Sequence, residues 1–275
     1  MEKRVGLMII GSQKCGTTTL FDVLNTHPLL QGSSPKELVY FCSNPRWQDN
    51  IGEYHSHFEW APGKIHFEGS VSYTNFPEIY SGTVKSLYEY NPDLKFIYLI
   101  RDPFERIVSA YMHLYARGFI DCTLEESILG SPKLINTTRY YMQLIPYIDA
   151  FGEESIFIEE FNTFINDRKS FLENVSAFLG VDYRCFPETA SIHTNKSIGG
   201  VQKRLSKYDQ PSLSLRLLKK VSRNAFNKLT DNSARSFGKR PELDETAREV
   251  VRRLLELDIK RLEELTKRKF DHWMT

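Results

Sequence analysis

The sequence lacks long apolar runs. Its uninterrupted hydrophobic stretches end at roughly six residues, far below the ~20 that a membrane-spanning helix needs. Its cysteines are few and lack the paired spacing of a zinc site, so free thiols are the expected state; they are Cys15, Cys42, Cys122 and Cys185. A formal net charge of +1 gives no global attraction to nucleic acid or membranes. What remains is an ordinary composition, 41% hydrophobic and 26% charged over 275 residues.

The N-terminal residues 1–4 lead directly into an apolar, strand-like segment and lack the hydrophobic core of a secretory signal. We therefore expect a cytoplasmic protein without a membrane partner.

Strand-like and helix-like segments alternate along most of the chain. Strands are predicted at Val5–Ile10, Ile65–Glu68, Phe96–Ile100 and Ile156–Glu159. Helices are predicted at Thr17–Leu24, Pro77–Tyr90, Pro103–Tyr115, Thr138–Phe151 and Lys169–Leu179. This alternation predicts one α/β domain over residues 1–275, with a central parallel sheet flanked by helices. Ligands bind beyond the carboxyl ends of such strands, where Gly11, Gly69 and Arg101 should meet.

The last part of the chain contains two further segments. An amphipathic helix is predicted at 242–269, and its apolar stripe is Ala247, Val250, Val251, Leu254, Leu255, Leu262 and Leu265. Residues 196–240 hold twelve Lys or Arg against two Asp. This basic segment is either a solvated helical face or a lid or acceptor-side wall beside an anionic ligand. Aromatic residues are sparse within it, which disfavours nucleic acid as its partner.

The segment from Gly11 to Thr19 joins the first predicted strand to the first predicted helix. Backbone N–H groups of such a turn point at one spot, and the helix dipole favours an anion there. A P-loop places its Lys directly after the second Gly. Here Thr17 follows Gly16, and Lys14 lies inside the loop. The segment therefore predicts a P-loop-like site for a phosphate ester, bound differently from a magnesium nucleotide.

A second anion site is predicted where Arg101 follows the strand Phe96–Ile100. An Arg presents a rigid fork of donors matched to phosphate oxygens, and Ser109 lies two turns along the next helix. Glu37 stands in a third cluster, the Pro-broken segment 34–41, which is a plausible active-site wall. Two separate anion sites suggest a ligand with phosphates at both ends.

In this order, the three clusters closely resemble the sulfotransferases that use 3′-phosphoadenosine 5′-phosphosulfate (PAPS). The loop resembles that family's 5′-phosphosulfate loop, and residues 101–111 resemble its motif R-D-P-x-x-R-x-x-S-x-Y. Residues 36–41 are similar to the segment K-E-x-x-x-F of the carbohydrate and heparan-type branch, which often has His where this chain has Val39. The resemblance to this family also extends to segments 138–140 and 178–180 and to the terminal helix.

The resemblance implies transfer of a sulfuryl group from PAPS, leaving 3′,5′-ADP, to a hydroxyl or amine without a metal. It implies catalytic roles for Lys14, Glu37 as general base, and His113. The residues implied to bind PAPS are Ser12, Gln13, Lys14, Cys15, Gly16, Thr17, Thr18, Thr19, Arg101, Ser109, Tyr140 and Lys196. The chain resembles a stand-alone, soluble bacterial form of the family that tailors secondary metabolites. The expected acceptor is a small polar natural product or a saccharide. A homodimer is a further partner compatible with the resemblance.

Two other functions stay open at this level. A P-loop small-molecule kinase would show magnesium-dependent ATP turnover, although it needs a Lys after Gly16. A catalytically inactive module that binds polyanions through residues 196–240 would bind nucleotide without transfer.

Overall fold

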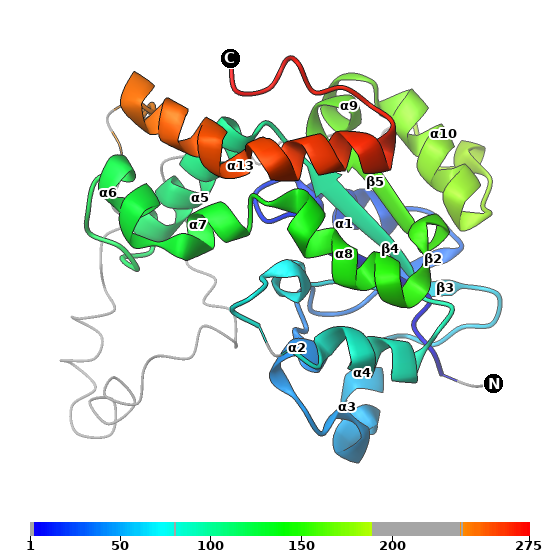
Figure 1. The fold of residues 1–275 in the computed structure, drawn as a ribbon. Coiled ribbons are helices and arrows are strands. Elements are labelled where there is room, and N and C mark those ends of the chain that lie inside the picture. The colour runs from blue at the N-terminus through cyan, green and yellow to red at the C-terminus, as the bar shows by residue number, and fades with distance from the viewer. Residues whose placement is uncertain (1–2, 80, 189–236, 238) are drawn as a thin grey trace.

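The computed structural model describes residues 3–79, 81–188, 237 and 239–275. Within these residues, five parallel strands form one sheet in the order β2-β3-β1-β4-β5 (Figure 1). The strands are β1 (Leu7–Gly11), β2 (Leu30–Gly32), β3 (Ile65–Gly69), β4 (Lys95–Ile100) and β5 (Ile156–Glu160). The predicted α/β fold, with a central parallel sheet flanked by helices, is confirmed.

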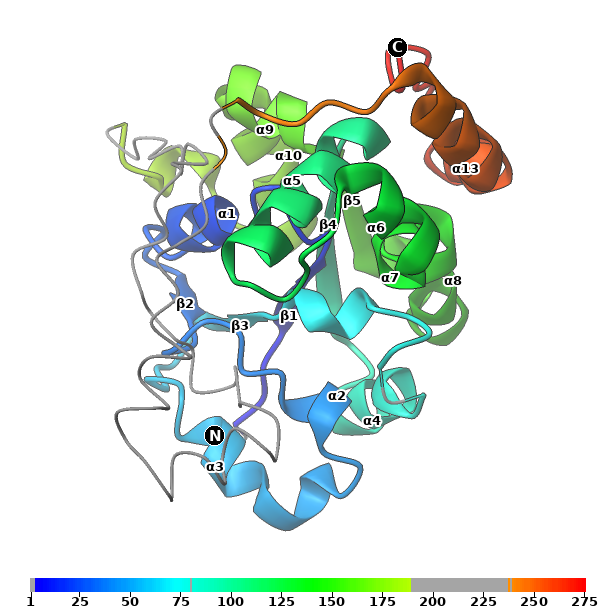
Figure 2. The same cartoon turned by 90° about the vertical axis from the view of Figure 1, so that its left-hand side faces the viewer.

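Alternating side chains of the strands face two helical layers, as the twofold periodicity of a strand requires. Leu7 and Ile9 pack with α1 (Thr17–Leu24), α9 (Phe161–Asn166) and α10 (Arg168–Leu179). Met8 and Ile10 pack with the opposite layer, which contains α4 (Thr83–Tyr90), α8 (Tyr140–Phe151) and the end of α13 (Glu245–Thr266). Figures 1 and 2 show these layers on either side of the sheet.

A third apolar cluster lies among α5, α6, α7 and the first half of α13. These helices are α5 (Pro103–Ala116), α6 (Leu124–Gly130) and α7 (Pro132–Asn136). Because α5 follows β4 after two residues, this cluster supports the helix that begins at the carboxyl end of the sheet.

Several short elements are absent from the sequence-based prediction. They are β2, α2 (Tyr40–Ser43), α3 (Ile51–His55), α6, α7, α9, and the 3₁₀ turns η1 (Trp47–Asn50), η2 (Val71–Thr74), η3 (Glu153–Ser155) and η4 (Tyr183–Cys185). The helix predicted at Pro77–Tyr90 begins only at Thr83. The backbone N–H of Glu78 instead closes a turn on Asn75 O at 2.8 Å, and Gly82 precedes the helix.

The C-terminal helix α13 packs against α8 and is shorter than the predicted range 242–269. The apolar stripe is correct for most of its positions, but Leu254 is 42% exposed. Of the basic segment 196–240, only residues 237, 239 and 240 lie inside the described residues. No helix in the described part of the chain is long and apolar enough to cross a bilayer.

Candidate active site

The loop after β1 is held against the neighbouring strand β4. The backbone N–H of Ser12 donates to Leu99 O at 2.8 Å, and Thr74 Oγ1 donates to Ile10 O at 2.6 Å. A Cβ on Gly11 would lie 2.3 Å from the Tyr98 ring and 2.6 Å from Thr74 Oγ1. Only glycine therefore fits where the chain leaves the sheet and enters the loop.

The N-terminus of α1 has no side-chain cap. Its N-cap residue Gly16 has φ 80° and no side-chain hydrogen bond, so the first-turn amides of residues 17–19 stay available for a ligand. By contrast, α5, α10 and α13 begin with the capping carboxylates Asp102, Asp167 and Asp244. An uncapped helix end with positive dipole potential fits the phosphate-ester site that the sequence predicts there.

Arg101 joins this loop to the second predicted anion site. Its Nη1 donates to Lys14 O at 3.5 Å, and its Nη2 donates to Glu105 at 2.8 Å. The guanidinium carbon lies 5.1 Å from the centre of the Phe161 ring. Glu105 also accepts a hydrogen bond from Arg240 at 2.7 Å. The structure thus brings the two sequence-predicted anion sites together at the carboxyl ends of β1 and β4.

One face of α5 is directed towards the loop. Ser109, His113 and Arg117 follow Glu105 at four-residue spacing, which places them on one side of the helix. Burial, and then the charges of Lys14 and Arg117, lower the pKa of His113 to about 4. Burial, Arg117 and Arg101 likewise lower the pKa of Lys14. The site is therefore rich in cations, and His113 is neutral. Arg117 was missed by the sequence-based prediction, although its four-residue spacing from His113 places it on the same side of the helix.

Glu37 lies beside the carboxyl end of β3. Its backbone N–H donates to Gly69 O at 3.0 Å, and Gly69 is paired with Ile9 of β1 in the sheet. Its carboxylate accepts a hydrogen bond from the Val71 N–H at 3.1 Å and forms an ion pair with Lys36. The side chain is 33% exposed, so a small molecule can reach it.

A buried carboxylate supports the segment that follows Glu37. Glu68 accepts hydrogen bonds from Tyr54 Oη and from Ser70 Oγ, each at 2.6 Å. Ser70 Oγ in turn accepts the Val39 N–H at 3.0 Å. Burial raises the pKa of Glu68. This network was also missed, because no local pattern signals a contact between β3 and residues 37–39.

Some of the residues predicted to bind the ligand have buried side chains. Tyr140 is fully buried, and its hydroxyl donates to Arg101 O at 2.7 Å, so it holds the backbone of Arg101 in place. Cys15 is fully buried, which raises the pKa of its thiol to about 11. Ser12 is 1% exposed and donates to Thr137 O at 3.5 Å. Gln13 and Thr19 are half-buried, Thr17 is buried and Thr18 is exposed, whereas Lys196 lies outside the described residues.

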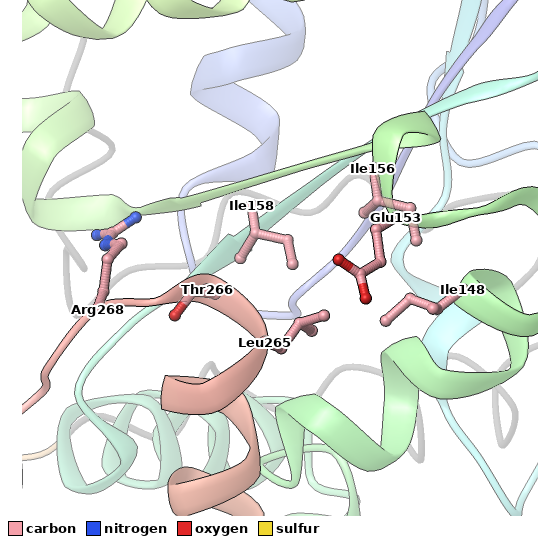
Figure 3. A pocket seen from close by; sticks show the side chains of 7 residues that line it. All are labelled: Ile148, Glu153, Ile156, Ile158, Leu265, Thr266 and Arg268. Carbon is pink, nitrogen blue, oxygen red and sulfur yellow. The ribbon is translucent and has the colours of Figure 1, made fainter.

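A separate pocket of about 210 Å³ lies beside the edge strand β5 (Figure 3). Its lining residues are Ile148, Glu153, Ile156, Ile158, Leu265, Thr266 and Arg268, none of which is a predicted site residue. Within residues 3–79, 81–188, 237 and 239–275, no group of three His, Cys, Asp or Glu side chains is placed to hold a metal ion.

The sequence model of the sulfotransferase family matches residues 73–184, which include Arg101, Ser109 and His113. Among curated proteins, the chain is 25% identical over 170 residues to bifunctional heparan sulfate N-deacetylase/N-sulfotransferase 1 of Caenorhabditis elegans. The match covers 56% of this chain and 19% of that protein. It is 35% identical over 108 residues to the membrane-associated sulfotransferase kil1 of Dictyostelium discoideum, covering 38% of this chain and 22% of that protein.

Heparan sulfate glucosamine 3-O-sulfotransferase 5 of Mus musculus is 29% identical over 105 residues, 38% of this chain and 29% of its own length. The chain thus spans less than a third of the length of these curated relatives. Among solved structures, a sulfotransferase from Alicyclobacillus acidocaldarius superposes with a TM-score of 0.70 at 23% identity, covering 99% of both chains. That likeness shows that the two proteins share a fold.

Proposed function

We propose that the chain transfers a sulfuryl group from PAPS to a hydroxyl or amine of a small polar natural product or saccharide; the match of residues 73–184 to the sulfotransferase family model and the similarity to heparan sulfate sulfotransferases support this. One observation carries the proposal: the uncapped loop around Lys14 and the guanidinium of Arg101 meet at one edge of the sheet, with Arg101 Nη1 3.5 Å from Lys14 O. A ligand with phosphates at both ends suits this pair of sites.

The 5′ end of PAPS would bind at the amides of residues 17–19, and its 3′-phosphate at Arg101 and Ser109. PAPS brings an activated sulfuryl group. As the acceptor oxygen or nitrogen forms its bond to sulfur, the bond from sulfur to the 5′-phosphate oxygen breaks and 3′,5′-ADP leaves. Lys14 and the loop amides would then meet the negative charge that grows on that oxygen and would stabilise the transition state more than the ground state.

Glu37 is suited to take the acceptor proton. The Val71 N–H and the Lys36 ammonium fix its carboxylate, and each carboxylate oxygen keeps a further lone pair for the acceptor. His113, neutral because burial and neighbouring cations lower its pKa to about 4, can accept a hydrogen bond from the acceptor or share the proton. Which molecule is sulfated depends on surfaces beyond these residues, and a cytoplasmic location remains an expectation.

Purified variants test the assignment. Lys14→Ala should lower kcat by ~10²–10³-fold, because a preorganised donor to the leaving group is lost. Glu37→Gln should lower kcat by ~10²–10⁴-fold, because proton transfer is lost. Lys85→Ala and Glu173→Gln are matched controls on exposed helix surfaces and should keep wild-type turnover.

The donor is tested by binding. 3′,5′-ADP should bind more tightly than 5′-AMP, and Arg101→Ala should remove most of that difference. Equal binding of the two nucleotides by the wild-type protein would refute the 3′-phosphate site. Magnesium-dependent turnover of ATP would indicate a kinase instead, and tight 3′,5′-ADP binding without transfer to any acceptor would indicate a binding module.

A further inference from the structure

Phe161 lies between the two anion-binding elements, although neither contains it in sequence. It follows β5 directly and is the first residue of α9. Its ring centre is 5.1 Å from the Arg101 guanidinium. A Cβ built on Gly16 would lie 2.4 Å from Phe161 Cε2, so the ring also contacts the loop where α1 begins. One aromatic side chain therefore touches both sites.

The geometry around Arg101 explains what this ring contributes. A guanidinium donates hydrogen bonds through its edge and stacks through its face. The guanidinium carbon of Arg101 lies over the Phe161 ring, so the ring stabilises the cation without supplying an acceptor oxygen that competes with an anion. Among the residues that the structure describes, the Arg101 side chain also contacts the half-exposed Glu105 at 2.8 Å and the Lys14 carbonyl at 3.5 Å. Ion pairs with exposed carboxylates hold a side chain only weakly, so the ring adds a contact that favours the observed position of the guanidinium.

We propose that Phe161 is a positioning residue for the 3′-phosphate. Its ring orients the Arg101 side chain and holds it at a fixed distance from the loop at Gly16. The inference rests on the proposed PAPS site. It predicts that Phe161 contributes to the preference for 3′-phosphorylated nucleotides without contacting the phosphate itself.

The test compares binding of 3′,5′-ADP and 5′-AMP in replacements of Phe161. Phe161→Leu keeps apolar bulk but removes the aromatic face, so the dissociation constant for 3′,5′-ADP should rise ~3–30-fold, the range of a cation–π contact. Binding of 5′-AMP should change much less. The KM for PAPS should rise with little change in kcat, because Lys14 and Glu37 are untouched. Phe161→Tyr keeps the aromatic face and should restore the preference.

Phe164→Leu is the matched control on the same helix. Phe164 is fully buried in the core layer beneath the sheet, so its replacement should lower the melting temperature without changing the ratio of the two affinities. A purely structural role for Phe161 would give the same pattern as Phe164. In an Arg101→Ala background, Phe161→Leu should no longer affect 3′,5′-ADP binding.

The outcomes separate the inference from the proposed function. If Arg101→Ala abolishes the preference for 3′,5′-ADP while Phe161→Leu preserves it, the positioning role is wrong and the PAPS site stands. If Arg101→Ala itself preserves the preference, the 3′-phosphate assignment fails. Should Phe161→Leu not fold, Phe161→Met decides the same question, since it also lacks an aromatic face.

Discussion

Replacing Gly16 by alanine probes the contact on which the site's geometry depends. Gly16 has φ 80° at the start of α1, a backbone conformation that side chains rarely adopt. The new Cβ would lie 2.4 Å from Cε2 and 2.6 Å from Cδ2 of Phe161. Since carbon atoms at such distances overlap, the ring or the loop must move, and a moved ring loses its contact with the Arg101 guanidinium.

The cost has two parts. A side chain in the left-handed region costs ~1–2 kcal/mol. Loss of the Phe161–Arg101 contact adds ~0.5–2 kcal/mol. The sum, about 1.5–4 kcal/mol, corresponds to a fall in melting temperature of roughly 3–16 °C at ~2–4 °C per kcal/mol for a chain of about this length.

Gly63→Ala is the matched control. Gly63 has φ 73°, yet a Cβ there meets nothing within 4 Å. This variant should lose only the ~1–2 kcal/mol of the backbone conformation. Thermal unfolding and 3′,5′-ADP titration of both variants then separate the backbone cost from the displaced ring.

We expect Gly16→Ala to be the less stable of the two and to bind 3′,5′-ADP at least ~10-fold more weakly, which is a loss of ~1.4 kcal/mol. Gly63→Ala should keep wild-type affinity. Equal stability of the two variants, together with wild-type affinity in Gly16→Ala, would refute the reasoning from the contact with Phe161.

Three further predictions concern titratable groups. The pKa of His113, about 4, lies below its ordinary 6.5, so protonation opposes folding and stability should fall as pH drops through that window. A bound polyanion should raise that pKa; calorimetry in two buffers near pH 5.5 should show proton uptake on 3′,5′-ADP binding, absent in His113→Asn. Asp258 accepts the Tyr141 and Met142 N–H groups at 3.1 and 2.9 Å, so Asp258→Ala should cost ~0.5–2 kcal/mol in urea unfolding. Burial raises the pKa of Asp258 from 3.8 to about 6, so the wild-type stability relative to Asp258→Asn should decline as pH rises from 4 to 6, and a constant difference would contradict this. A thiol reagent at pH 8 should label exposed Cys185 quickly but Cys15 only after unfolding, because burial raises the pKa of Cys15 to about 11; rapid labelling in a variant with Cys42, Cys122 and Cys185 all replaced by Ser would contradict the buried position of Cys15.

Elements with strong periodicity were predictable from the sequence. The prediction Thr17–Leu24 matches α1, and the four predicted strands match β1, β3, β4 and β5 to within two residues at each end. The strand β2 was missed because its three residues, Leu30–Gly32, are too few for an alternating pattern. The predicted helix at Pro77 failed because a local turn and Gly82 outweighed the apolar spacing.

The site likewise has residues that the sequence identified and residues that only the structure revealed. Lys14 and Arg101 were identifiable, because each follows a strand and has a chemistry suited to anions. The partners that hold Arg101 were not: Tyr140 reaches its carbonyl from α8, and Phe161 reaches its guanidinium from the end of β5. Such contacts join segments far apart in the chain, and no local pattern encodes them.

By itself, the sequence determined the alternation of strands and helices, the loop with Lys14 inside it, and the order of the anion-binding segments, because these depend on local periodicity and residue chemistry. Only the tertiary structure decided that β1 lies beside β4, which brings Lys14 and Arg101 within one hydrogen bond of each other. It also decided that one ring, Phe161, contacts both. The order of strands depends on how the apolar faces of all strands and helices are buried against one another. No single segment of the sequence determines that arrangement.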